Sequence, residues 1–488
     1  MGLAFIPLYI QYVGIEAYGL IGLFALLQAW LRLLDMGMTP TLGREMARFT
    51  GGSHSAQSIL DLLRSIEILA VVVALLIAGG VALGSNWIAT SWLKADALPS
   101  TVVAQAFALM GLVTALRFVE GVYRSAIVGL QRQVLFNVVN SVMATLRGLG
   151  AVAILAWVSP TIEAFFLWQG LVSIVTLGIL AATTYTSMPK ASRAGRFSLE
   201  ALRGIWRFAG GMTVITILAL LLTQVDKVLL SKLLSLSEFG YYTLAATVAA
   251  ALYMLITPIT QAVYPRLCEL HASDDQLALI NVYHQGAQLV SVFAGSAAIV
   301  IILFAETFLR LWTQDAELAE RVAPLLSLLM FGNLLNGLMW IPYQTQLAHG
   351  WTSLAVKFNI VAVVIIVPAI LLVTPYYGVI GAAWVWVGLN TGYLMIGIHL
   401  MYQRILSREK WLWYAQDLLA PIGVAALASC ALAALWPDIK GNLTDFTLLA
   451  LAAGITLGTA TLAANRIRRL LWHWLNNYWI KGYAAHDY

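Results

Sequence analysis

Seven ionisable residues lie within apolar stretches long enough to cross a bilayer, and they are the clearest chemical signals in the sequence. They are Arg32, Asp35, Arg117, Glu120, Arg147, Asp226 and Lys227. A charge that faces lipid costs about 2.5 to 3.5 kcal/mol on insertion scales, so such residues normally face a bundle interior or a water-filled cavity. Arg147 has no acidic residue within four positions, and a guanidinium binds phosphate through a planar fork. This pattern predicts a cationic cavity for a phosphorylated lipid.

Several of these residues have alternative partners within the chain. Arg32 and Asp35 are three positions apart on one helix face, so they can form a static ion pair. Asp226 and Lys227 are adjacent and point about 100° apart, which favours a structural role over mutual pairing. Three carboxylates are candidates for carrying a coupling proton: Asp35, Glu120 and Asp226.

A charged stripe runs along one helix face, because Arg117, Glu120 and Arg124 are spaced by three and four positions. Arg147 lies near the centre of the following apolar stretch. The alternative to an anionic substrate is that Arg147 pairs across helices with Glu120 or Asp35, and the sequence leaves both interpretations open.

No catalytic or metal-binding arrangement is found in the sequence. The seven histidines have no metal-ligand spacing, and there is no Ser/His/Asp pattern, phosphate-binding loop or dinucleotide fingerprint. Cys268 and Cys430 lie in or beside apolar runs and cannot build a disulfide framework. We therefore expect neither an enzyme nor a cofactor.

The elements that position these residues must be membrane-spanning helices. Of 488 residues, 61% are apolar and 10% are charged, which is too little polar surface for a soluble globule. The apolar runs are about 20 residues long and uninterrupted, as helices and not barrel strands require. We predict an all-α polytopic fold with about 14 spans. They are 2–13, 18–42, 66–84, 100–122, 134–157, 162–182, 208–230, 240–264, 285–306, 322–344, 353–374, 378–401, 415–436 and 445–464.

The sequence also contains a duplication with an offset of 222 positions. Three pairs of landmarks share this offset: Glu16 with Glu238, Arg44 with Arg266, and Phe136-Asn137 with Phe358-Asn359. An even number of spans separates the copies, so both enter the membrane in the same direction as parallel lobes. Such internal repeats are typical of transporters.

The duplication predicts four regions along the chain. A six-helix lobe covers residues 1–182, and a basic cytoplasmic linker covers 183–207. A second six-helix lobe covers 208–402, and 403–488 adds two further spans and an interfacial tail. Of the 28 basic residues, 19 fall in alternate connections and the tail, which are cytoplasmic by the positive-inside rule. The net charge of +5 therefore reflects topology and not a nucleic-acid partner.

One polar stretch has no charge. In the tenth span, five side chains are suited either to sugar hydroxyls or to interhelical hydrogen bonds. They are Asn333, Asn336, Tyr343, Gln344 and Gln346.

Several motifs resemble bacterial polysaccharide flippases of the Wzx type, within the multidrug/oligosaccharidyl-lipid/polysaccharide exporter superfamily. In the first lobe these are residues 12–20 (YVGIEAYGL), 34–38 (LDMGM) and 43–48 (GREMAR). In the second lobe they are residues 226–230 (DKVLL), 238–242 (EFGYY) and the pair Pro265-Arg266. The similarity covers roughly residues 1 to 405.

The resemblance implies transport of an undecaprenyl-pyrophosphate-linked oligosaccharide for O-antigen, capsule or exopolysaccharide assembly. It places the chain in the bacterial inner membrane, among membrane lipids, with polysaccharide polymerase and glycosyltransferases as possible partners. Two lobes would rock around a central cationic cavity. Substrate-binding candidates are Arg147, Arg32 and Arg117 within the spans, with Arg44 and Arg266 at the cytoplasmic mouth.

Two rival functions remain open from the sequence. A cation-coupled multidrug or lipid II exporter of the same superfamily is one, although cationic drugs favour an acidic cavity and this chain has an excess of intramembrane arginine. A membrane glycosyltransferase or polymerase is the other, and it needs an acidic active site with a substantial extramembrane loop. The sequence contains neither feature.

Overall fold

The computed structural model describes residues 2–50, 52, 54–188, 193–203, 217, 220–221, 224–351, 353–435 and 441–472. Throughout these ranges the regular elements are helical, and the one bridge between extended residues joins Lys94 to Ser235. Eleven helical stretches are long and apolar enough to cross a membrane. A helix satisfies its own backbone hydrogen bonds, as a segment in lipid must. The predicted all-α polytopic fold is confirmed, and the chain is a multi-pass membrane protein.

The chain divides into two compact units, Met1–Tyr241 and Tyr242–Tyr488. The first unit extends beyond the predicted linker because residues 224–241 pack on it. The backbone N–H of Leu236 donates to the carbonyl of Lys94 at 2.8 Å. A Cβ atom added at Gly19 would lie 2.6 Å from the Leu236 carbonyl oxygen, so the two segments approach as closely as glycine allows. The division at residues 182 and 207 stays a prediction.

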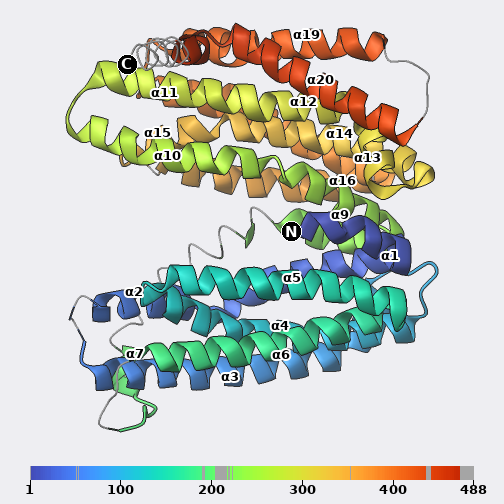
Figure 1. Cartoon of the computed structure of the whole chain (residues 1–488), viewed down its shortest axis with the longest axis vertical. Helices are drawn as coiled ribbons and strands as arrows, with labels where there is room; N and C mark the ends of the chain where they lie inside the picture. Colours follow the sequence, from blue (N-terminus) through green and yellow to red (C-terminus); the bar gives the residue numbers. More distant parts are fainter. Residues whose placement is uncertain are drawn as a thin grey trace, which may run out of the picture. The chain divides into compact units, whose positions relative to one another are not determined.

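In the first unit, α4 packs against both α3 and α6, and α5 lies along α6 (Figure 1). Their apolar faces meet in a core that contains Leu63, Ile66 and Val122. The Ser55 and Thr161 side chains cap the first turns of α3 and α6. The elements are α1 (Gly2–Leu31), η1 (Arg32–Asp35), α2 (Met38–Thr50), α3 (Ala56–Trp87), η2 (Ile88–Trp92), α4 (Ser100–Gly129), α5 (Gln133–Trp157), α6 (Ile162–Ser187) and α7 (Leu199–Arg203).

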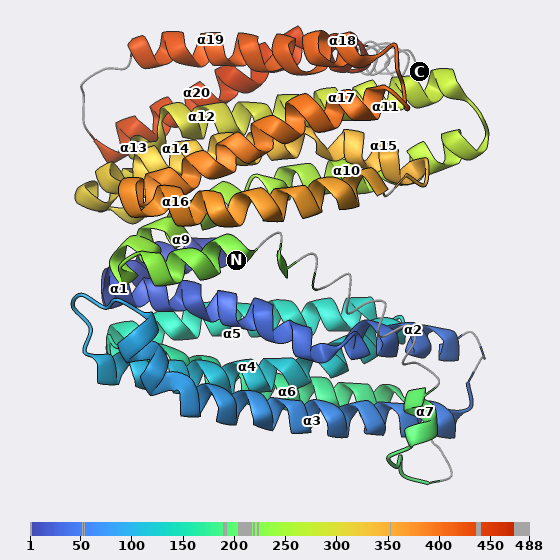
Figure 2. The same cartoon turned by 180° about the vertical axis from the view of Figure 1, so that it is seen from behind.

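In the second unit, α14 packs along α16, while α19 and α20 pack against each other and on α12 (Figure 2). The elements are α9 (Leu236–Ala250, which crosses the unit boundary), α10 (Tyr253–Ala272), α11 (Gln276–Val290), η3 (Ser291–Gly295), α12 (Ser296–Leu303), α13 (Ala305–Thr313), α14 (Ala316–Leu338), α15 (Trp340–Ala348), α16 (Ser353–Gly392), η4 (Tyr393–Gly397), α17 (Ile398–Tyr402), α18 (Lys410–Leu412), η5 (Trp413–Leu419), α19 (Ala420–Ala434) and α20 (Asn442–Ala463).

Two long helices are broken at a glycine with a left-handed backbone. Gly14 in α1 has φ 81°, and Gly378 in α16 has φ 56°. Only glycine adopts these angles without steric cost. The breaks lie where the sequence predicts one span to end and the next to begin, after residues 13 and 374.

Other predicted boundaries differ from the structure. The span predicted to run from 18 to 42 is not one helix, because Met36 and Gly37 adopt positive φ and the chain turns between η1 and α2. The predicted span 208–230 lies largely outside the described residues, as does the predicted interfacial tail from residue 473. The count of about 14 spans stays a prediction.

Candidate functional site

Three charged residues of the first unit meet inside its helix bundle, and we call Arg117, Glu120 and Arg147 the charge cluster. Arg117 and Glu120 lie one turn apart on α4, and Arg147 lies at the middle of α5. An Nη atom of Arg147 is 3.6 Å from a carboxylate oxygen of Glu120. Glu120 is 1% exposed, so its carboxylate is shielded from water. Only helix packing brings these side chains together, because 27 positions separate Glu120 from Arg147.

Arg147 has no acidic neighbour on its own helix, but one lies across the bundle. The alternative, pairing with Glu120 across helices, describes the contact that the structure contains. The pairing is incomplete, since at 3.6 Å it is an ion pair without a good hydrogen bond. The same Nη atom of Arg147 also donates to the hydroxyls of Ser173 and Thr176 on α6, at 3.4 and 3.5 Å.

Arg117 is held by neutral groups. Its two Nη atoms donate to the amide oxygens of Gln28 at 3.1 Å and Gln169 at 2.9 Å. Its guanidinium also lies 5.0 Å from the centre of the Phe24 ring, at cation–π distance. These contacts orient Arg117 without neutralising its charge.

The charge cluster thus carries two cations and one anion. Among the described residues, no hydrogen-bond partner is found for three buried atoms: Nε of Arg117, Nε of Arg147 and one carboxylate oxygen of Glu120. Buried polar groups are rarely left in this state, and each unmet group costs about 1 to 3 kcal/mol or more when charged. The arrangement can therefore accept a further anion with acceptor oxygens.

Two of the other predicted intramembrane residues, Asp35 and Lys227, have hydrogen bonds to residues outside this cluster. The Asp35 carboxylate accepts hydrogen bonds from the backbone and hydroxyl of Thr39, so it caps the first turn of α2. The side chain of Arg32 lies outside the described residues. Asp226 lies in the helical stretch 224–233, beside Lys227, whose Nζ donates to Gln224 at 3.3 Å.

The two arginines predicted at the cytoplasmic mouth are surface residues. The Arg44 side chain on α2 is 47% exposed and lies 3.8 Å from Glu45. Arg266 on α10 is 49% exposed and pairs with Glu269 one turn later. Both members of the Arg266–Glu269 pair are exposed, and such a pair contributes at most about 1 kcal/mol. Both residues stay candidates for long-range attraction of an anion.

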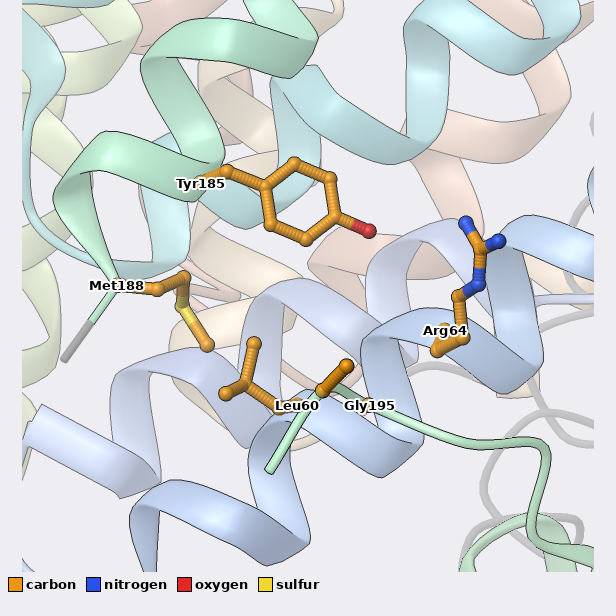
Figure 3. A pocket seen from close by; sticks show the side chains of 6 residues that line it. Leu60, Arg64, Tyr185, Met188 and Gly195 are labelled. Carbon is orange, nitrogen blue, oxygen red and sulfur yellow. The ribbon is translucent and has the colours of Figure 1, made fainter. Parts of the chain in front are cut away.

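A second polar cluster in the first unit was not predicted from the sequence. The buried Glu67 carboxylate on α3 accepts hydrogen bonds from the hydroxyls of Tyr123 and Tyr185 and from Arg64 at 2.6 Å. A spacing of three between Arg64 and Glu67 was the one available signal. Tyr185 and Arg64 also border a cavity of about 350 Å³ beside Gly195 (Figure 3), and its lining residues do not include the charge cluster.

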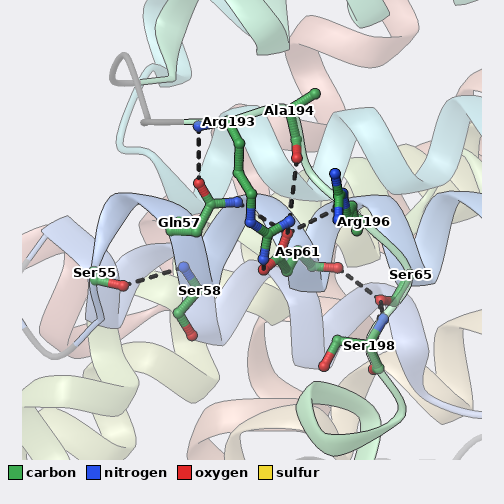
Figure 4. A network of polar contacts seen from close by, with 9 residues as sticks. All are labelled: Ser55, Gln57, Ser58, Asp61, Ser65, Arg193, Ala194, Arg196 and Ser198. Carbon is green, nitrogen blue, oxygen red and sulfur yellow. Dashed lines mark hydrogen bonds and ion pairs between the residues drawn. The ribbon is translucent and has the colours of Figure 1, made fainter.

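An ion pair and hydrogen bonds connect the segment that follows α6 to α3 (Figure 4). Asp61 binds the guanidinium of Arg193 at 2.8 Å and accepts from the backbone N–H of Arg196 at 2.8 Å. The Ser65 hydroxyl accepts from the backbone N–H of Ser198 at 2.8 Å. The described part of the predicted linker therefore belongs to the first unit.

The second unit holds an uncharged counterpart, which we call the amide cluster: Tyr253, Asn333, Asn336, Trp386 and Asn390. The side-chain oxygen of Asn336 accepts from the Tyr253 hydroxyl at 3.1 Å, and its nitrogen donates to Asn390 at 2.9 Å. The Trp386 indole donates to Asn333 at 2.9 Å. Two of the five predicted polar residues, Asn333 and Asn336, thus connect α14 to α10 and α16.

No group of three or more His, Cys, Asp or Glu side chains suited to a metal ion occurs within the described ranges.

Comparisons with known proteins agree with this architecture. A Shigella flexneri protein whose assigned role is O-antigen transport is 20% identical over 378 residues, which cover 77% of this chain and 87% of that protein. A structure of the lipid II flippase MurJ, in an inward closed conformation, matches with a TM-score of 0.71 at 10% identity, covering 94% of this chain and 96% of MurJ.

An inward-facing multidrug resistance MATE family transporter of the MOP superfamily matches with a TM-score of 0.68 at 14% identity, covering 84% of this chain and 94% of that one. These folds are those of transporters and not of enzymes, and the resemblance to polysaccharide flippases of this superfamily is confirmed. The model of one family matches residues 13–315. On that match, the chain belongs to the polysaccharide biosynthesis protein family.

Proposed function

We propose that this chain is a flippase that moves an undecaprenyl-pyrophosphate-linked oligosaccharide across the bacterial inner membrane by alternating access. The observation that carries the proposal is the composition of the charge cluster. Two guanidinium groups lie beside one carboxylate, which pairs with Arg147 alone of the two, and each guanidinium has a buried Nε without a hydrogen-bond partner among the described residues. The family match and the transporter fold support the same substrate class.

The chemistry of a diphosphate suits this cluster. Its oxygens are strong acceptors in a compact, multiply charged group, and guanidinium donors bind such groups in a bidentate manner. The long contact between Arg147 and Glu120 is weaker than a direct charge-assisted hydrogen bond, so a phosphate can replace the carboxylate as the partner of Arg147.

This exchange also suggests how coupling could work. Once Arg147 turns to the phosphate, Glu120 remains buried without its cation, and a buried carboxylate in that position favours protonation. Glu120 is therefore our first candidate for a coupling proton, ahead of Asp226. Asp35 is the weakest of the three candidates, because its carboxylate already caps α2.

Reconstitution of the purified full chain in liposomes tests the proposal. The substrate is an undecaprenyl-diphosphate oligosaccharide with a fluorophore on the sugar that an external, impermeant reductant bleaches. We expect that the protein moves labelled substrate from the inner to the outer leaflet, so that the reductant bleaches this fraction as well. Bleaching of the inner-leaflet fraction should be much smaller for a neutral undecaprenyl glycan. Bleaching limited to the outer leaflet, as in protein-free liposomes, contradicts the proposal, and so does efflux of a cationic dye alone. Competition by lipid II distinguishes a lipid II exporter from an oligosaccharide flippase.

A further inference from the structure

A buried histidine in the second unit contacts two carboxylates. His284 on α11 is 1% exposed, and its Nδ1 atom is hydrogen-bonded to Asp417 in η5. Its Nε2 atom lies 3.1 Å from Glu409, the residue before α18. The helices α11, α17 and α18 lie at the same end of this unit (Figure 2). More than 120 positions separate His284 from each carboxylate, so the chain fold alone creates the group.

The hydrogen-bond chemistry of this group fixes how many protons it holds. An ionised carboxylate only accepts, so each ring nitrogen must carry a hydrogen, or else a carboxylate must be protonated. Neutral imidazole supplies one hydrogen, whereas the two contacts need two. We infer that His284, Asp417 and Glu409 form a proton-binding site, whose extra proton holds residues 403–409 against α11.

The surroundings stabilise one carboxylate more than the other. Asp417 is 1% exposed and also accepts from the side-chain nitrogen of Gln288 at 2.9 Å. The Gln288 oxygen accepts in turn from the backbone N–H of Arg466 at 2.9 Å, and the charge of Arg466 acts on Asp417. The Glu409 side chain is 16% exposed, and the ion pair that the structure gives it within the described residues is with His284.

Among the described residues, the other titratable groups beside the site include three phenols. The Tyr283 ring lies edge-on to His284, with centroids 5.2 Å apart, and its hydroxyl is hydrogen-bonded to that of Tyr402. Tyr414 lies near enough to act electrostatically on Tyr283 and Tyr402. The Nζ atom of Lys410, the residue after Glu409, is hydrogen-bonded to Nδ1 of His399 at 2.8 Å. Phenols stay neutral over the pH range in which histidine titrates, so the three named groups carry the extra proton.

The contact that depends on the proton is the one to Glu409. When the extra proton dissociates, one ring nitrogen of His284 and the carboxylate oxygen beside it have no hydrogen between them. Neither atom can then donate a hydrogen bond, so one of the two His284–carboxylate contacts must break. Asp417 keeps its bond to Gln288 and lies deeper, whereas Glu409 can turn to water. Raising the pH is therefore expected to release residues 403–409 from α11.

Spin labelling of the purified full chain tests this inference without any substrate. A nitroxide on Ser407→Cys, an exposed position in the 403–409 segment, is introduced with Cys268→Ser and Cys430→Ser. Spectra are recorded in nanodiscs from about pH 5.5 to about pH 9, the range in which histidine changes charge. We expect an immobile label at low pH and a growing mobile component as the pH rises.

Glu409→Gln is the decisive variant. An amide can accept from an N–H or donate to a bare nitrogen, so its contact with His284 needs no extra proton. We expect the label to stay immobile at every pH in Glu409→Gln, and His399→Gln, the matched control, to keep the pH response. A pH-independent spectrum in the parent protein, or a response that survives Glu409→Gln, would overturn the inference. Because transport is not measured, failure here is distinct from failure of the flippase assignment.

Discussion

The buried polar clusters of the two units differ in their charge and in how completely they are hydrogen-bonded. In the first unit, three polar atoms of the charge cluster are buried without hydrogen bonds to any part of the chain that the structure describes. In the second unit, the amide cluster contains no ionised side chain, and Asn336 alone satisfies both Tyr253 and Asn390. The predicted offset of 222 positions places Met339, Pro342 and Ala369 where the first copy has its charged residues. At these three matched positions, charged residues occur in the first copy only.

This difference indicates that the two clusters have different roles. A complete hydrogen-bond network rigidifies a bundle and gains little from a ligand. An incomplete, charged network is costly unless something else completes it. If duplication gave both copies one framework, the retained charge in the first unit is the part that a substrate headgroup can use. Four substitutions test this contrast, and the expected effects on transport decrease from the first to the last.

Arg147→Ala is expected to have the largest effect. It removes the cation that contacts Glu120 and leaves that carboxylate buried alone. Loss of a charge-assisted contact of about 2 to 3 kcal/mol corresponds to a fall in transport of roughly 30- to 100-fold. Surface polysaccharide in a host that depends on this chain measures the fall, with protein level followed by immunoblot.

Two controls accompany this substitution. Arg147→Lys should restore part of the activity, because the charge survives although the planar fork is lost. Arg132→Ala removes an exposed arginine before α5 and should change little. Normal polysaccharide display by Arg147→Ala at normal protein level contradicts a substrate role for the charge cluster.

Glu120→Gln should reduce transport about tenfold and also lower stability. The two arginines then lose their only carboxylate in the cluster, and breaking a buried ion pair costs about 3 kcal/mol. Thermal unfolding in detergent measures the second effect. Added inorganic diphosphate should recover part of the lost stability, because it replaces the missing anion. If diphosphate stabilises parent and variant equally, the carboxylate and the phosphate do not compete for Arg147.

Asn336→Leu tests the second unit and should lower transport only a few-fold. The Tyr253 hydroxyl, the Trp340 indole and the Asn390 amide each lose a partner. Interhelical hydrogen bonds in membranes average about 0.6 kcal/mol, so the expected loss of stability is about 1 to 2 kcal/mol. Stabilisation by diphosphate should be unchanged. A loss of diphosphate binding as large as that of Arg147→Ala would remove the contrast between the two units.

Arg266→Ala should have the smallest effect, less than about twofold, because the exposed pair with Glu269 contributes little to stability. Any effect should appear at low ionic strength and disappear at about 0.5 M salt, where long-range attraction is screened. A defect that persists in high salt would instead place Arg266 in direct contact with the substrate.

Much of the fold followed from residue patterns, whereas the site followed only in part. Apolar runs predicted the helices, and the boundaries near Gly14 and Gly378 coincide with left-handed glycines. Arg147 was also singled out from the sequence, as a charge in an apolar run with no acidic residue nearby in its own helix. Its partner did not, because the spacing rules for helices relate only residues three or four positions apart.

Other groups had no sequence signal at all. His284 stands alone in its own helix, and Asp417 and Glu409 come more than 120 positions later. Glu67 has Arg64 nearby, but the two tyrosine hydroxyls that complete its shell come from α4 and α6. Tyrosine is common in apolar helices, so its presence does not mark such a cluster.

The sequence by itself determined that this chain spans the membrane as helices, because lipid permits no other solution for uninterrupted apolar runs of this length. It also determined which residues carry charge into the bilayer. Only the tertiary structure decided which charges meet: Arg147 with Glu120, and His284 with Asp417 and Glu409. The physical reason is that electrostatic contacts act over a few ångströms, and helix packing sets those distances independently of separation along the chain.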